Sequence, residues 1–217
     1  MIDLYCERLQ PSLWDEPINA ISNLVFFIAA WVSWRLADNL NVQFYSVKLL
    51  IYLMIGIGIG SSLFHTYATG WALLMDVIPI MMFQLFYLWI YTRRVMKLKP
   101  IIPVILMLVL LIYSLLTLPL KVLNGSLSYV PALVYLLGLG IYNFQAKKQN
   151  KFMFLAGVVT FLIALFFRTL DQAICPVFPI GTHFLWHIFN GVMLYFVTGC
   201  LLFNLKVNQS NLLRNKA

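Results

Sequence analysis

The sequence predicts an all-α membrane protein, a bundle of seven transmembrane helices with the N-terminus outside and the C-terminus in the cytoplasm. Of the 217 residues, 62% are hydrophobic and only 10% are charged, whereas soluble domains are closer to half apolar and a quarter charged. The apolar residues fall in stretches of about 20, the length that spans a bilayer as a helix. Because the stretches are joined by short connections, residues 1–217 are predicted to form a single integral membrane domain.

The distribution of basic residues sets the predicted orientation. The predicted spans are 19–38, 46–65, 71–92, 101–119, 127–144, 152–170 and 181–204. They leave residues 1–17 as an extracytoplasmic segment and residues 205–217 as a cytoplasmic tail. With the N-terminus outside, 12 of the 15 lysines and arginines face the cytoplasm, as the positive-inside rule requires. The net charge of +8 follows this topology and is not gathered on one soluble face, so it does not indicate nucleic-acid binding.

The N-terminal segment is acidic and leads into a first span with a polar face. Four of the seven acidic residues lie in this segment: Asp3, Glu7, Asp15 and Glu16. It is either a solvated tail or an oxygen-rich site for a hard cation such as calcium. Glu16, Asn19 and Asn23 share one helical face and are expected to turn inward, because hydrocarbon cannot satisfy polar groups.

The second and third spans contain the first candidate functional residues. Gly56 and Gly60 are small residues at a spacing that lets two helices approach closely. Ser61 and His65 lie four residues apart on one face, near the outer end of the second span. Asp76 lies within the third span, where an aspartate costs about 2.5–3.5 kcal/mol to insert. It is therefore a functional candidate; a hydrogen-bonded packing residue is the alternative.

The fourth and fifth spans indicate no chemistry, whereas the sixth ends with Arg168 and Asp171. These opposite charges lie three residues apart along the chain, near the outer interface. An ion pair that pins the following loop is one interpretation, and a polar contact with a substrate is the other.

Cys6 and Cys175 both fall on the outer side of the predicted topology. A periplasm or lumen would be oxidising, so a Cys6–Cys175 disulfide and two unpaired thiols are both compatible with the sequence. Cys200 lies deep in the last span, where packing accounts for it.

The histidines suggest a metal site. His183 and His187 lie four residues apart at the start of the last span. His65 is the only other histidine in the sequence. The topology places all three, with Asp76, at one depth on the outer side.

Three imidazoles with one open position are a common catalytic zinc arrangement, which activates water. Asp76 would transfer its proton, and Ser61 would hydrogen-bond a developing oxyanion. Unrelated packing histidines, or a structural metal in a receptor or transporter, are the alternatives.

These residues resemble the motifs of a known family. They are Ser61-x-x-x-His65, Asp76 eleven residues further on, and His183-x-x-x-His187. They resemble the alkaline ceramidases, part of a superfamily of seven-span hydrolases that includes the adiponectin-receptor/hemolysin III proteins. The runs Cys6-Glu7 and Glu16-x-x-Asn19-x-x-Ser22-Asn23 favour the ceramidase branch.

The resemblance implies an activity and a site. It implies that the three histidines bind zinc and that Asp76 and Ser61 support the activated water. The implied reaction, part of sphingolipid metabolism, is hydrolysis of a ceramide-like membrane lipid to a fatty acid and a sphingoid base at the extracytoplasmic side. Another lipid amide or an ester stays open as the substrate. The family's disulfide between the N-terminal segment and the loop before the last span agrees with Cys6 and Cys175.

The resemblance also implies a calcium site in the N-terminal segment. The Tyr5 carbonyl, Glu7 and Glu16 align with the ligands of that site. The sequence departs from the family pattern here, because Leu4 stands where an aspartate is expected and Leu9 replaces an asparagine. The interval between Glu7 and Glu16 is also shorter than in the family.

Overall fold

The computed structural model describes residues 1–10, 12–117, 119–120 and 122–214, which form helices and loops without any strand. The helices are α1 (Pro17–Ser22), α2 (Leu24–Asn39), α3 (Tyr45–Tyr67), α4 (Gly70–Ile90), α5 (Ile101–Thr117), α6 (Val130–Gln145), α7 (Lys151–Ile174) and α8 (His183–Arg214). A π-helical turn, η1 (Tyr91–Val95), extends α4, and a 3₁₀ segment, η2 (Val122–Tyr129), precedes α6.

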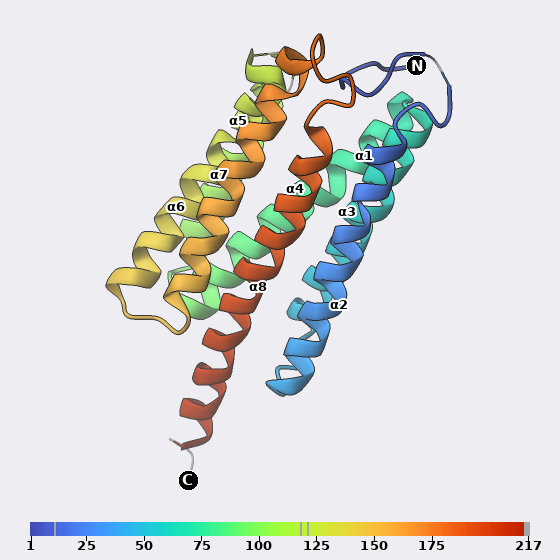
Figure 1. The fold of residues 1–217 in the computed structure, drawn as a ribbon. Coiled ribbons are helices and arrows are strands. Elements are labelled where there is room, and N and C mark those ends of the chain that lie inside the picture. The colour runs from blue at the N-terminus through green and yellow to red at the C-terminus, as the bar shows by residue number, and fades with distance from the viewer. Residues whose placement is uncertain (11, 118, 121, 215–217) are drawn as a thin grey trace.

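The long helices form a closed bundle in chain order. From α2 to α8, each helix packs against the next one along the chain, and α8 also packs against α2. Figure 1 shows α8 in the middle of the view, between α7 and α2, and the two chain termini at opposite ends of the bundle. The connections are short, as the sequence predicts, so neighbours in the chain are neighbours in space.

Six of the predicted spans coincide with helical stretches that are long and apolar enough to cross a membrane in the described part of the chain. They are Pro17–Asn39, Tyr45–Tyr67, Gly70–Val95, Val122–Gln145, Lys151–Ile174 and His183–Gln209. The remaining predicted span corresponds to α5, an apolar helix of 17 residues. At 1.5 Å per residue it is about 25 Å long, so the count of seven spans and the orientation of the termini stay predictions.

The last helix is longer than the sequence predicts. α8 continues to Arg214, past the expected end at residue 204, because no proline or glycine follows Gly199. Most of the predicted cytoplasmic tail is therefore helical, and residues 215–217 of that tail lie outside the described residues.

The outer surface of the bundle is apolar. Large hydrophobic side chains face outward from several helices, among them Trp31 at 66% exposure, Ile105 at 52% and Phe166 at 60%. A soluble protein rarely exposes contiguous apolar surface of this kind. Together with the helix lengths, the surface makes this chain a multi-pass membrane protein.

A close contact between α3 and α4 lies next to two of the predicted site residues, Ser61 and Asp76. A Cβ atom at Gly60 would collide with the backbone carbonyl of Met75. The absence of a side chain at Gly60 thus lets α3 approach α4 directly at the level of Ser61 and Asp76, the residues that follow Gly60 and Met75.

The N-terminal segment covers the end of the bundle where α3 ends and α8 begins. Ile2 donates its backbone N–H to the Ala68 carbonyl at 2.7 Å. Cys6 forms a disulfide with Cys175, just after α7, with the two Cα atoms 5.4 Å apart. The segment is therefore fixed both to the α3–α4 turn and to the α7–α8 loop.

Candidate metal centre

Three histidines from two helices converge at this end of the bundle. His65 lies in the last turn of α3, while His183 and His187 lie one turn apart at the start of α8. All three are at most 2% exposed, and each offers a ring nitrogen within 4.8 Å of the nitrogens offered by the other two. The Nε2 atoms of His65 and His187 are 3.2 Å apart. These distances permit one ion to contact all three rings.

The rings of His65 and His187 are held from behind by two polar side chains, one just before α1 and one at its end. The Nδ1 atom of His65 lies 2.5 Å from Oε2 of Glu16, and the Nδ1 atom of His187 lies 2.7 Å from Oγ of Ser22. Metal-binding histidines commonly use one ring nitrogen for such a partner, which fixes the ring and leaves the other nitrogen for the metal. The sequence predicted an inward polar face here but not these two pairings.

The third ring is placed by stacking. His183 stacks on the Tyr5 ring with a centroid distance of 3.6 Å. Its buried Nδ1 atom has no hydrogen-bond partner within the described residues. Because buried polar atoms are nearly always paired, this free nitrogen, beside two oriented imidazoles, fits a metal-binding group. The donor set of three imidazoles also suits a divalent transition metal.

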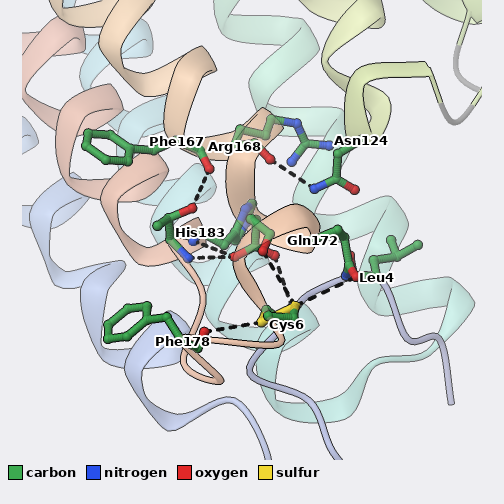
Figure 2. The surroundings of a disulfide bond; sticks show 11 residues. Leu4, Cys6, Asn124, Phe167, Arg168, Gln172, Phe178 and His183 are labelled. Atoms are coloured by element: carbon green, nitrogen blue, oxygen red, sulfur yellow. Dashed lines mark hydrogen bonds between the residues drawn. A yellow bond between two sulfur atoms is a disulfide. The ribbon is translucent and has the colours of Figure 1, made fainter.

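Asp171 caps the start of α8 and thereby sets the position of His183. Its fully buried carboxylate accepts the backbone N–H groups of Thr182 at 2.7 Å, His183 at 2.9 Å and Cys6 at 3.0 Å. Figure 2 shows these bonds beside the disulfide. Gly181 has a φ of +68°, and a Cβ atom there would collide with the Asp171 carboxylate. The carboxylate also complements the positive end of the α8 dipole.

The predicted ion pair between Arg168 and Asp171 is wrong, because Asp171 is committed to these backbone groups. Arg168 instead lies among the rings of Tyr129 and Trp186, each 5.3 Å from its guanidinium carbon. It also donates to the Tyr5 hydroxyl at 3.3 Å. The sequence did not reveal the role of Asp171 because capping across a loop depends on tertiary structure.

A small polar cavity connects two of the histidines with the other candidate residues. Ser61, Asp76 and Arg168 line it together with His183 and His187. Asp76 is 8% exposed and Ser61 is 3% exposed. The structure thus brings Ser61 and Asp76 to the histidines, as the sequence predicts, and adds the guanidinium of Arg168.

A larger apolar cavity continues from the small one into the bundle. Phe26, Ile57, Ile80, Tyr129 and Trp186 line both cavities, and the larger one contains about 790 Å³ of space not filled by atoms, part of it open to the surroundings.

The walls of the larger cavity are almost free of polar groups. Tyr87 and Tyr135 line it with their rings, but their hydroxyls donate to the carbonyls of Val197 and Leu106, respectively. A long hydrocarbon chain is the ligand type that such a cavity suits.

The residues aligned with a calcium site are used differently. The Tyr5 carbonyl accepts the Arg8 N–H at 3.3 Å. Glu7 accepts the N–H groups of Ile18 at 2.7 Å and of Asn19 at 2.8 Å, capping α1. Glu16 contacts Arg8 and His65. As arranged here, Tyr5, Glu7 and Glu16 do not fit a calcium ion, which requires six to eight free oxygen ligands.

Glu7 and Glu16 have pKa shifts in opposite directions. Burial raises the pKa of the Glu7 carboxyl despite the two N–H groups that it accepts. Burial alone would also raise the pKa of Glu16, but the hydrogen bond from His65 and the charge of Arg8 hold it below the usual value. Glu16 is therefore kept as a carboxylate, the form that can accept a proton donor from His65.

Fold and site together define a multi-pass membrane protein with a buried group of three histidines that could hold a metal ion, next to a small polar cavity that adjoins a larger apolar one. The family model described as Ceramidase matches residues 5–213 of the chain. No curated protein matches the chain significantly. Because the family match covers nearly the whole length, the chain belongs to the ceramidase family. It is accordingly a membrane hydrolase that acts on the amide bond of ceramide, an enzyme of sphingolipid metabolism.

Proposed function

We propose that the chain is a zinc-dependent amidase that cleaves ceramide-like N-acyl lipids into a fatty acid and a sphingoid base. The observation that carries this proposal is the convergence of three buried imidazoles where a small polar cavity meets a large apolar one. The polar part suits the amide bond, and the apolar part suits a hydrocarbon chain.

His65, His183 and His187 would hold the zinc ion. Imidazole nitrogen is a preferred zinc ligand, and three such ligands leave one coordination position open for chemistry. Glu16 and Ser22 would fix the rings of His65 and His187 through their Nδ1 atoms. When bound, zinc supplies Lewis acidity, which activates water for attack at neutral pH.

The remaining polar residues of the cavity would manage the proton and the developing charge. Asp76 would accept a proton from the attacking water and return it to the amide nitrogen as the C–N bond breaks. Ser61 would donate a hydrogen bond to the carbonyl oxygen, where negative charge develops. Arg168 would oppose the same charge, because its guanidinium lines the same cavity. One water and one amide thus give one carboxylic acid and one amine.

The apolar cavity would take the acyl chain of a lipid that enters from the bilayer. Burial is worth about 0.8 kcal/mol per methylene group, so the cavity favours long chains. We place the site on the extracytoplasmic side. The asymmetry of the basic residues supports this orientation, and so does the disulfide at the same end of the bundle, since disulfides persist in oxidising compartments.

Two alternative functions would also involve a metal at this site: a receptor or transporter with a structural metal, and a zinc hydrolase with another substrate. A structural metal in a receptor or transporter would be closed by a fourth protein ligand, but the metal-binding group within the described residues has three members. That observation favours the enzyme. A zinc hydrolase of another lipid amide or of an ester would share the same site and differs only in substrate.

Replacing Asp76 separates these possibilities. Wild type, Asp76→Asn and the control Asp38→Asn, an exposed carboxylate outside the site, would be purified in detergent. Zinc content would be measured by elemental analysis, and fatty acid release from ceramide would be followed by mass spectrometry. We expect about one zinc per chain in all three, because Asp76 is not a ligand. Activity should fall about 10²–10⁴-fold in Asp76→Asn alone, the usual loss for a general base.

Three outcomes would contradict the proposal in different places. Absence of zinc from purified wild type would contradict the proposed metal centre. Bound zinc together with hydrolysis of other N-acyl lipids or esters, but not of ceramide, would contradict the proposed substrate. Full activity in Asp76→Asn would contradict the proposed proton transfer by Asp76.

A further inference from the structure

The N-terminal segment contains a buried cation of its own. The side chain of Arg8 is 2% exposed, and all three of its nitrogens have partners. Nε donates to Oε1 of Glu16 at 2.6 Å. One terminal nitrogen donates to the Ser12 carbonyl at 3.0 Å, and the other donates to the His65 carbonyl at 3.1 Å. A guanidinium buried so completely is stable only when its charge is paired.

Arg8 is joined to the metal centre through Glu16. The two carboxylate oxygens of Glu16 are divided between Arg8 and His65, at 2.6 Å and 2.5 Å. Glu16 is 1% exposed, so water does not compete for these oxygens. Arg8 therefore contacts His65 twice, once directly at its carbonyl and once through the carboxylate at its ring.

The same arrangement occupies the oxygens that a calcium ion would need. Glu7 is committed to the start of α1, and Glu16 to Arg8 and His65. Asp15 accepts the N–H groups of Leu9 and Gln10, both at 2.5 Å. A divalent ion in this segment would also lie close to the fixed positive charge of Arg8, and like charges at short range repel strongly in a buried environment.

We propose that the Arg8 guanidinium is the cation of this segment in place of calcium, and that Arg8 acts through Glu16 as a positioning residue for His65. The enzyme accordingly does not bind or require calcium. The second part rests on the proposed zinc function, whereas the calcium part stands independently of it.

The calcium part is tested on the purified full-length protein in detergent. After dialysis into calcium-free buffer, calcium and zinc are measured in the same sample. The melting temperature and the ceramidase activity are then followed while calcium chloride is added to about 1 mM, the affinity range of extracellular calcium modules. We expect no bound calcium and no change in melting temperature or activity. Stoichiometric calcium, or a melting temperature that rises as calcium is added, would overturn the inference even if the protein proved inactive on ceramide.

The positioning part is tested with Arg8→Met, Arg8→Lys and the control Arg35→Met, which removes an exposed charge of α2 outside the metal centre. The readout is zinc affinity, measured by competition with a chromogenic chelator. Loss of a partner behind a metal ligand typically weakens metal binding about 10–100-fold. We expect a loss of at least about tenfold in Arg8→Met, a smaller loss in Arg8→Lys, which keeps the charge but not the fork of donors, and none in Arg35→Met.

Two results would overturn the positioning role. Wild-type zinc affinity in Arg8→Met would show that Glu16 holds His65 without Arg8. Equal losses in Arg8→Met and Arg8→Lys would show that the positive charge at this position does not help to hold His65. Melting curves of the variants without zinc would show whether they are folded before their affinities are compared.

Discussion

The depth of the apolar cavity predicts how the enzyme selects acyl chains. Tyr129 lines both cavities, and Leu139 lines only the larger one. Both residues lie along the same helical segment, ten residues apart, so the cavity extends about 15 Å beyond the level of Tyr129 at 1.5 Å per residue. Leu139 is 7% exposed and lies about three helical turns beyond Tyr129. A larger side chain there should shorten the space for the acyl chain without touching the metal centre.

The variant Leu139→Trp gives this prediction a magnitude. If the indole displaces about four methylene groups at about 0.8 kcal/mol each, long-chain substrates lose about 3 kcal/mol. At 1.4 kcal/mol for each factor of ten, kcat/KM should fall by about 100-fold for long chains. Substrates whose acyl chains end before the indole should be cleaved at the wild-type rate.

The assay is fatty acid release from a series of ceramides that differ only in acyl length. Leu137→Trp is the control, because Leu137 lies on the same helix but is 40% exposed on the outer surface. A uniform loss for all lengths would indicate a general defect, and no loss for any length would place the acyl chain elsewhere. Either result would refute the assignment of this cavity to the acyl chain.

Two further substitutions test the framework of the site. Gly60→Ala should lower the stability of the fold by about 1–3 kcal/mol, and with it the melting temperature, because it overpacks α3 against α4. Gly56→Ala should be tolerated, since the nearest neighbour of the added Cβ atom would be a Pro79 carbon at 3.6 Å. Equal melting temperatures of the two variants would contradict this prediction. Ser22→Ala should weaken zinc binding by about tenfold in a competition titration, because it removes the partner of the His187 ring; unchanged affinity would show that this hydrogen bond does not orient the ring.

Much of the site could be predicted from the sequence because its main residues lie at helix ends joined by short connections. Ser61, His65 and Asp76 lie on consecutive helices, so the hydropathy pattern alone places them at one level. His183 and His187 share a helical face. An even number of crossings between His65 and the start of the last helix then brings all three histidines to one side of the membrane.

The partners of the histidines could not be predicted, because they depend on how the N-terminal segment folds back. Glu16 and His65 are separated by 49 residues, and Ser22 and His187 by 165. The sequence indicated an inward polar face at Glu16 but not which groups it meets. Arg8 is one of the three basic residues that the predicted topology leaves on the outer side, and a buried arginine cannot be distinguished from an exposed one without the structure.

Removal and return of the metal test the central claim most directly. Wild type and His187→Ala would be stripped of metal, zinc would be added back in steps, and bound zinc and ceramide hydrolysis would be measured at each step. We predict that wild-type activity rises in proportion to bound zinc and is complete at about one ion per chain, and that His187→Ala stays inactive. Full ceramidase activity in metal-free wild type would contradict the claim that the three histidines hold a catalytic zinc ion.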